Sequence, residues 1–448
     1  MRSIFTTLLF FMIQYPLHSQ SQFTIHPGLY TLGTADKPTS EQLVNLPFID
    51  GVVIRTKWEA VEIQPDLFNW TYIDSEILNA KKFGKKSVIQ ILGNPSWLWD
   101  SLSVKTYQYV DLNEYHPTFG DTLYDVISWD PLYLQRVEQV IVKLAEKYST
   151  DTNVVSINAV SGNISRNLPE KIADGRNFWE TYNYHPDTLV AKLRRVLDVY
   201  MKAFPTTPLW SSMDYVSFET KASGKSRNYV CGEYAKYGVT KYPDRFGLWR
   251  EDISGCTVYP PNVGSQWNVM NLYTERTGAQ MLWHVQDGPA RMNQCGISDT
   301  AKSGVMKAAL EKGRKFGIRY FEIYGSDVKD TSLHKVFTSF AELLRSPVTN
   351  IAEQNRTSRI QSFTLFQNFP NPFNPVTSIG FILDRSGMTT VKVYDATGKE
   401  ITTLVNEYVI SGVFHQRQFN AAMFASGTYF IRLFSNNSVQ TKKLLLVK

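Results

Sequence analysis

The sequence predicts an α/β protein: a (β/α)8 TIM barrel followed by a small all-β sandwich. Eight short apolar runs lie between residues 26 and 345, and most are separated by segments of helical periodicity. Such alternation in a region of this size is typical of a barrel of parallel strands. Behind it, residues 362–448 hold short alternating strands divided by Gly, Asn and Pro, which is typical of a β-sandwich. A chain of 448 residues has room for both units.

Residues 1–19 are expected to form a secretory signal peptide. Arg2 precedes an apolar run at residues 4–13, and Ser19 offers a small residue at the expected cleavage point. The run is shorter than the ~20 apolar residues that a membrane-spanning helix needs. A core helix or a membrane anchor is the alternative. We therefore expect an exported, soluble mature protein.

The barrel strands are predicted from apolar runs that have the length of buried strands. Helices are predicted where apolar residues recur at a spacing of three to four. A doubly wound open sheet is the alternative, but no Gly-rich phosphate loop follows the first run. The predicted strands are 28–33, 51–55, 87–93, 154–160, 208–213, 246–249, 280–285 and 318–324, and the clearest helices are 68–83, 132–148, 189–204 and 301–316.

Composition excludes several classes of partner. The net charge is only +6, and no Lys/Arg run reaches the density of a nucleic-acid-binding stripe. Seven His and three Cys are too few and too scattered for a zinc framework, so we expect no metal and no cofactor. At most one disulfide can form, and a Cys231–Cys256 bridge is plausible in an exported protein. Three thiols, with Cys295 among them, are the alternative.

The C-terminal region resembles a known family. A polar stretch at 346–361 is expected to be a linker. Behind it, the motifs FQNFPNPFNP (366–375), VYDATG (393–398), ASGTY (425–429) and KKLLLVK (442–448) follow in order. They resemble the type IX (Por) secretion C-terminal sorting domain. The resemblance implies a Gram-negative source and delivery to the cell surface or the medium, with residues 362–448 addressing the type IX machinery.

The ends of the predicted barrel strands carry the candidate binding residues. In a barrel, the carboxyl ends of the strands converge on one face, where active sites lie. Aromatic rings there can stack on the apolar face of a sugar, while polar groups hydrogen-bond its hydroxyls. The expected substrate-binding residues are Arg55, Trp58, Trp97, Asn158, Trp283 and His284.

The first third of the barrel resembles the barrel glycoside hydrolases that include bacterial β-galactosidases and cellulases. Residues 51–62 (GVVIRTKWEAVE) and 68–74 (FNWTYID) carry the resemblance, together with WDPLY at 129–133. It implies hydrolysis by a pair of carboxylates and a stabilising role for Glu62. In those families an acid follows the Asn at the end of strand four, whereas this chain has Asn158–Ala159. Their nucleophile ends strand seven, where this chain offers Gln286 and then Asp287.

Other carboxylates are therefore the catalytic candidates. Glu322, at the end of the last barrel strand, and Glu170, in the loop after strand four, are the leading pair; Asp214, Asp252 and Asp287 are alternatives. A retaining enzyme needs carboxyl groups about 5–5.5 Å apart, and an inverting one about 6.5–9.5 Å. Glu170 could instead be a solvated loop residue, and Glu322 could form a structural ion pair with Arg55.

The predicted function is that of a secreted or cell-surface glycoside hydrolase-like protein acting on a polysaccharide or oligosaccharide. The alternative is a catalytically degenerate barrel that binds glycans at the surface.

Overall fold

The computed structural model describes most of the chain. The residues described are Phe23, 26–111, 118–158, 181–213, 229–257, 267–286, 288–345, 363–368, 370–383, 387–409, 414–435 and 438–448. The expected signal peptide and the expected linker at 346–361 lie outside them.

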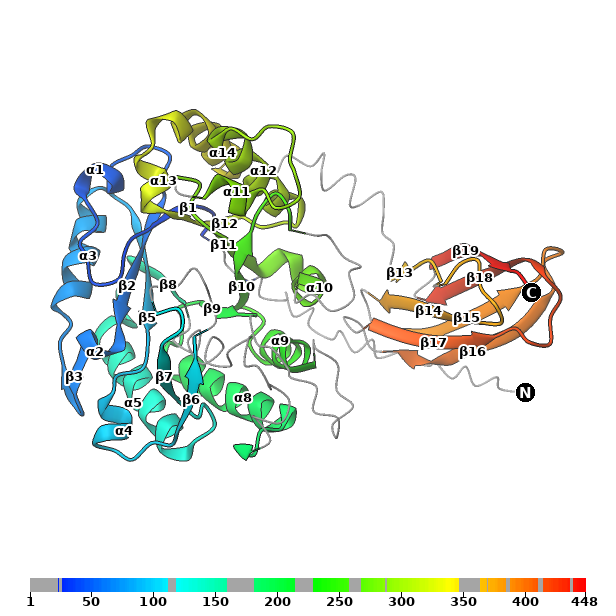
Figure 1. The fold of residues 1–448 in the computed structure, drawn as a ribbon, viewed down its shortest axis with the longest axis horizontal. Helices are drawn as coiled ribbons and strands as arrows, with labels where there is room; N and C mark the ends of the chain where they lie inside the picture. The colour runs from blue at the N-terminus through cyan, green and yellow to red at the C-terminus, as the bar shows by residue number, and fades with distance from the viewer. Residues whose placement is uncertain are drawn as a thin grey trace, which may run out of the picture.

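Eight parallel strands close into a barrel in chain order, which confirms the predicted fold (Figure 1). The barrel closes where the first strand pairs with the last, from Gly28 with Tyr320 to Leu32 with Tyr324. The strands are β1 (Gly28–Leu32), β2 (Gly51–Lys57), β5 (Lys86–Leu92), β8 (Val154–Asn158), β9 (Leu209–Ser212), β10 (Phe246–Ile253), β11 (Thr277–Met281) and β12 (Tyr320–Tyr324).

Helices surround the barrel strands (Figure 1). Helix α5 shows how the sequence places one: Asp130 accepts hydrogen bonds from the backbone N–H groups of Leu132 and Tyr133, and Pro131 occupies the first turn. The described helices on the outside are α1 (Glu41–Val44), α3 (Thr71–Lys82), α5 (Pro131–Tyr148), α8 (Pro186–Ala203), α9 (Tyr229–Lys241), α10 (Trp267–Met270) with the 3-10 helix η1 (Asn271–Arg276), α12 (Lys302–Lys315) and α14 (His334–Arg345).

Short elements follow several barrel strands. After β2 come α2 (Trp58–Val61) and the strand pair β3 (Glu62–Gln64) and β4 (Leu67–Phe68). After β5 come α4 (Trp97–Asp100) and a hairpin of β6 (Thr106–Val110) and β7 (Thr122–Val126). Helix α11 (Pro289–Met292) follows β11, while α13 (Gly325–Lys329) and the 3-10 helix η2 (Thr331–Leu333) follow β12.

Large aromatic side chains fill the amino-terminal part of the barrel interior. Tyr30, Trp210 and Tyr320 pack there with Phe23, which precedes the first strand. Glycines on the neighbouring strands leave space for these rings, because a Cβ on Gly51 would lie 2.3 Å from the Tyr30 ring. A Cβ on Gly247 or Gly278 would likewise meet these rings, at 2.6 and 2.8 Å. The interior is therefore a packed core at this end.

The C-terminal region folds as two antiparallel sheets around one core, which confirms the predicted sandwich. One sheet has the order β13–β14–β17 and the other β16–β15–β18–β19. Their apolar side chains form a cluster separate from those of the barrel. The strands are β13 (Phe363–Leu365), β14 (Val376–Leu383), β15 (Gly387–Tyr394), β16 (Glu400–Val409), β17 (Phe414–Asn420), β18 (Gly427–Ser435) and β19 (Ser438–Leu446).

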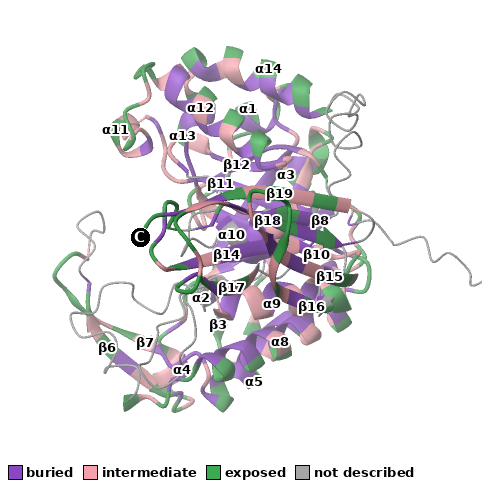
Figure 2. Cartoon of the chain, turned by 90° about the vertical axis from the view of Figure 1, so that its right-hand side faces the viewer, coloured by how far each residue is buried: buried purple, intermediate pink, exposed green. Residues whose placement is uncertain are grey.

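Burial follows the layers of the fold. Helices such as α12 and α14 alternate buried and exposed stretches because only one side faces the barrel (Figure 2). Within the described residues, no helix has both the length and the apolar character needed to cross a bilayer.

Candidate active site

A polar layer lies inside the barrel, beyond the aromatic core toward the carboxyl ends of the strands. Arg55 on β2 is the register partner of Gln90 on β5, and Gln90 is the register partner of Asn158 on β8. Because alternate residues of a strand share one face, Arg55 lies on the same side of β2 as the inward-facing Val53, and Gln90 on the same side of β5 as Val88. Three adjacent strands thus present a cation and two amides to the interior.

Glu322 completes this polar layer from the opposite wall. Its strand, β12, lies across the barrel from β8. Asn158 Nδ2 donates a hydrogen bond to Glu322 Oε1 over 3.2 Å, and the Tyr320 hydroxyl donates to the same oxygen over 2.8 Å. Glu322 and Asn158 are completely buried. The barrel closure therefore brings together residues that are far apart in sequence.

The environment of Glu322 favours its protonated form. Burial raises the pKa of Glu322 to about 7, because a carboxylate loses its hydration there. The Tyr320 hydroxyl, the charge of Arg55 and the Asn158 amide act in the opposite direction and limit the rise. Near neutral pH the group can therefore both release and take up a proton.

Several buried polar atoms of this layer have no hydrogen-bond partner among the residues that the structure describes. They are Arg55 Nε, Gln90 Oε1, Asn158 Oδ1, Trp249 Nε1 and Glu322 Oε2. The set includes both donors and acceptors. Such orphaned groups are costly in a protein interior unless a water or a ligand satisfies them. A molecule with several hydroxyl groups could satisfy both kinds at once.

The proton of the neutral Glu322 has a defined place. Both hydrogen bonds described above are donated to Oε1, so the acid proton belongs on Oε2. Oε2 is the oxygen without a partner. A protonated Glu322 would therefore carry its acid hydrogen on the oxygen that no described group contacts.

Trp283 and His284 lie close together beside the last barrel strand. Their rings stack at 4.6 Å, and His284 meets Tyr324 edge-on at 5.4 Å. The Arg291 guanidinium lies 3.9 Å from the centre of the Trp283 ring, so part of the indole is already covered. Tyr324 accepts a hydrogen bond from Gln280 Nε2.

Trp58 and Trp97 lie in a different place, outside the polar layer. Trp58 is buried, with 1% of its surface exposed, and its Nε1 donates to Glu62 Oε2 over 2.8 Å. Glu62 also forms a buried ion pair with Arg136. Trp97 is half-buried, donates to the Glu62 carbonyl and stacks on Arg136. This network joins α2 to α5, which supports the stabilising role expected of Glu62.

The other candidate carboxylates are not brought to Glu322 within the described residues. Asp252 is bound by Arg250 and by Trp267 Nε1, at 2.9 Å from the indole. Glu170, Asp214 and Asp287 lie outside the described residues. The same residues contain no group of three or more His, Cys, Asp or Glu that could hold a metal ion.

Strand seven begins and ends earlier than predicted. It spans Thr277–Met281 rather than 280–285, so Gln280 is within the strand and Trp283 follows it. The sequence pattern misled because Leu282 and Val285 continue the apolar run past the last ladder pair. The loop after the strand is fixed by Asp327, which accepts the backbone N–H groups of Val285 and Gln286.

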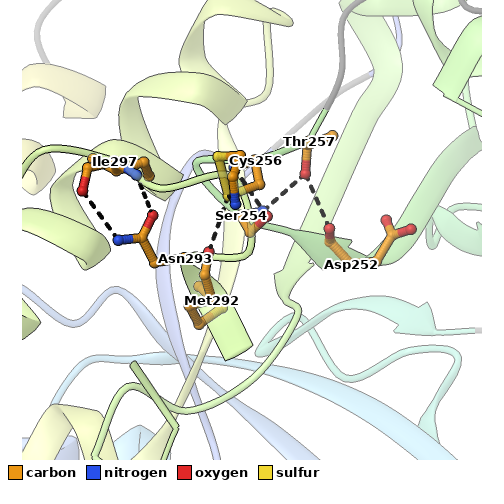
Figure 3. Close-up of a disulfide and its surroundings, with 8 residues drawn as sticks. Asp252, Ser254, Cys256, Thr257, Met292, Asn293 and Ile297 are labelled. Carbon is orange, nitrogen blue, oxygen red and sulfur yellow. Dashed lines mark hydrogen bonds between the residues drawn. A yellow bond between two sulfur atoms is a disulfide. The ribbon is translucent and has the colours of Figure 1, made fainter. Parts of the chain in front are cut away.

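The disulfide differs from the suggested one. Cys256 pairs with Cys295, and Cys231 is a buried thiol on α9 that forms no disulfide. The bridge ties the loop after β10 to the loop after α11, beside the Asn293–Ile297 turn (Figure 3). On the other side of the bridge, Thr257 Oγ1 donates to the Asp252 carbonyl (Figure 3). Spacing could not identify this pair, because the partners meet only when two strand ends converge.

Sequence reasoning missed Gln90, Trp249 and Tyr320. Gln90 could have been found, because it is a polar residue between Ile89 and Ile91 in a buried strand. Nothing in the sequence distinguishes Trp249 or Tyr320 from ordinary core aromatics. Their role depends on the closed barrel.

The fold and the polar layer define a (β/α)8 barrel with a buried acid in its interior, joined to a β-sandwich. Residues 367–448 match the family model of the secretion system C-terminal sorting domain, which confirms the resemblance of the tail. A search of curated proteins found no match.

Solved structures that resemble this chain include glycoside hydrolases. The catalytic domain of a β-amylase from Paenibacillus polymyxa is 14% identical, with a TM-score of 0.43, over 71% of this chain and 99% of that one. A β-galactosidase from Rahnella sp. R3 is 10% identical, with a TM-score of 0.42, over 72% of this chain and 57% of that one. A family 39 glycoside hydrolase from Bacteroides cellulosilyticus WH2 is 10% identical, with a TM-score of 0.34, over 87% of this chain and 80% of that one. Each of these likenesses concerns the fold.

Proposed function

We propose that the protein is a glycoside hydrolase, exported through the type IX pathway, in which Glu322 is the general acid. The observation that carries the proposal is the polar layer itself. Its unpartnered donors and acceptors suit the hydroxyl groups of a sugar, and its buried acid has a pKa of about 7. A general acid works best with a pKa near the operating pH.

In this mechanism Glu322 Oε2 gives its proton to the glycosidic oxygen as the bond to the sugar breaks. Asn158 and Tyr320 hold the other oxygen and stabilise the carboxylate that forms. A second carboxylate must attack the sugar or activate water. Glu170, Asp214 and Asp287 are its candidates, and no cofactor is needed.

The export part of the proposal rests on both ends of the chain. A signal peptide at residues 1–19 would direct the chain across the inner membrane. The sorting domain, with proposed limits 362–448, would then address the type IX machinery of a Gram-negative bacterium and leave the barrel, at 26–345, on the cell surface or in the medium. The sorting-domain match supports the second step.

A surface glycan-binding protein is the second candidate function. It is favoured by Asn158–Ala159, where the resembling hydrolases carry an acid, and by the single carboxylate in the described part of the polar layer.

The test is to incubate the protein with a panel of polysaccharides and oligosaccharides and to measure hydrolysis as the release of reducing ends. Glu322→Gln should lower the rate by roughly 10²–10⁴-fold, while Glu311→Gln, an exposed residue of α12, should leave it unchanged. Glycan binding without hydrolysis would favour the second function. Undiminished activity in Glu322→Gln would remove Glu322 from the mechanism.

A further inference from the structure

Arg55 is a cation without a counter-ion contact inside the barrel. Its guanidinium makes no hydrogen bond or ion pair with any residue that the structure describes, and its Nε is fully enclosed. Asp36, whose backbone N–H donates to the Arg55 carbonyl, directs its carboxylate to Thr56 Oγ1 and to the Lys57 N–H instead. A guanidinium has five N–H donors, and leaving the enclosed Nε unpaired is costly, while the rest of this half-buried side chain can still receive a ligand.

The neighbours of Arg55 in the polar layer do not neutralise it. Gln90, beside it on β5, and Asn158, one strand further, carry no charge. Glu322 is the acid that interacts with Arg55 through space, but its burial keeps it largely protonated below neutral pH. At mildly acidic pH the described part of the layer therefore carries a net positive charge.

We infer that the glycan bound by this barrel is acidic, with the carboxylate of a uronic acid unit paired to Arg55. A guanidinium binds a carboxylate through two parallel hydrogen bonds, a geometry that neutral hydroxyl groups do not match. The amides of Gln90 and Asn158 then meet hydroxyl groups of the same sugar. The inference rests on the proposed function and names its substrate class.

The carboxylate of the ligand also acts on the general acid. Arg55 lowers the pKa of Glu322 through its charge, so pairing Arg55 with an anion weakens that effect and raises the pKa. The other groups that face Glu322 are Tyr320, Asn158 and Trp249, with Tyr30 and Gln280 as its register partners on the adjacent strands. None of these carries a charge near neutral pH. Binding an acidic glycan should therefore make Glu322 take up protons.

The experiment is calorimetric titration of the full mature chain at pH 6. The probes are trisaccharides of galacturonate, glucuronate, mannuronate and guluronate, each with its carboxyl-reduced neutral counterpart. At least one acidic probe should bind roughly 10-fold or more tightly than its counterpart, as expected for hydrogen bonds to charged groups. At pH 7, titration in two buffers of different ionisation enthalpy should reveal net proton uptake.

Variants separate recognition from folding. Arg55→Gln should abolish the preference for the acidic probe, and Arg55→Lys should retain part of it because the charge remains. Lys57→Gln, which removes an exposed charge from the same strand, should leave the preference unchanged. Arg55→Gln should also not lower the melting temperature, since Arg55 has no structural partner to lose.

The two possible failures are distinguishable. If neutral glycans bind as well as acidic ones, or if Arg55→Gln keeps the preference, the acidic substrate is refuted while the proposed function stands. If no glycan of either kind is bound or hydrolysed, both fail.

Discussion

At the scale of single residues, Glu322 combines burial with an incomplete set of partners. One oxygen accepts two hydrogen bonds and the other has no partner. A purely structural carboxylate, such as Glu62, instead has its oxygens engaged by Trp58, Arg136 and the Asp66 N–H. The comparison within one barrel distinguishes a carboxylate with an unpartnered oxygen from one whose oxygens join neighbouring elements.

The raised pKa of Glu322 predicts a specific pH dependence of stability. The group binds a proton more tightly in the folded state, so its contribution to stability is present below pH 4.5 and is lost as the pH rises through about 7. The shift corresponds to about 3 kcal/mol. We therefore compare the free energy of unfolding of Glu322→Gln with that of the wild type by urea unfolding. This difference should favour the variant more at pH 8 than at pH 5.

The control for this prediction is Glu59→Gln, which alters an exposed carboxylate after β2. This substitution should change the free energy of unfolding little at either pH. An equal difference between wild type and Glu322→Gln at pH 5 and pH 8 would contradict the raised pKa.

Sequence could predict part of this layer. Arg55, Asn158 and Glu322 were identified because strand ends meet on one face of a barrel. Trp58 follows a strand in the same way, but the helical turn of α2 directs its side chain toward Glu62 and the core. Strand order gives the position of a residue, and only the closed structure gives the direction of its side chain.

At the scale of elements, three barrel strands carry a glycine where a larger residue would collide with an aromatic ring of the interior. Gly51→Ala should destabilise the protein by about 1–3 kcal/mol through overpacking. Its Cβ would meet both the Tyr30 ring and, at 2.7 Å, the rigid Lys86 carbonyl. Denaturant unfolding measures the change.

Gly232→Ala is the matched control. Gly232 lies within α9, and a Cβ there would meet nothing within 4 Å. Alanine loses less backbone freedom than glycine in a helix, so this variant should gain about 0.5–1 kcal/mol. Equal effects of the two alanines would refute the packing argument.

The disulfide fixes two loops at the carboxyl ends of β10 and β11. Replacing Cys256 and Cys295 with Ser should lower the free energy of unfolding by about 2–4 kcal/mol, whereas Cys231→Ser should not affect the bridge. In the wild type, a thiol reagent should find one thiol after denaturation and none before, because Cys231 is buried. Three reactive thiols in the denatured, unreduced protein would contradict the bridge.

Element positions were predictable where apolar periodicity and end signals agree. The helix predicted over 132–148 begins one residue earlier, at Pro131, because Asp130 caps its first turn. Strand seven was misplaced, since Leu282 and Val285 are buried or half-buried in a loop and resemble strand residues in sequence. Tertiary burial, rather than pairing, explains those apolar residues.

At the scale of the whole molecule, the barrel and the sandwich have separate cores. The sequence of residues 346–361 predicts a linker between them, with Arg356 and Arg359 as tryptic sites. Brief trypsin treatment should therefore yield two stable fragments, identified by mass spectrometry. Cleavage first within the barrel would contradict the predicted boundary.

The closure of the barrel sets an order of events for a chain that is made from its amino terminus. Strand β1 needs β12 as a neighbour, and Phe23, just ahead of β1, needs Trp210. Neither partner is available until much of the chain has been made. Strand β1 therefore waits with one open edge until Tyr320–Tyr324 have been added, and the barrel cannot close before then.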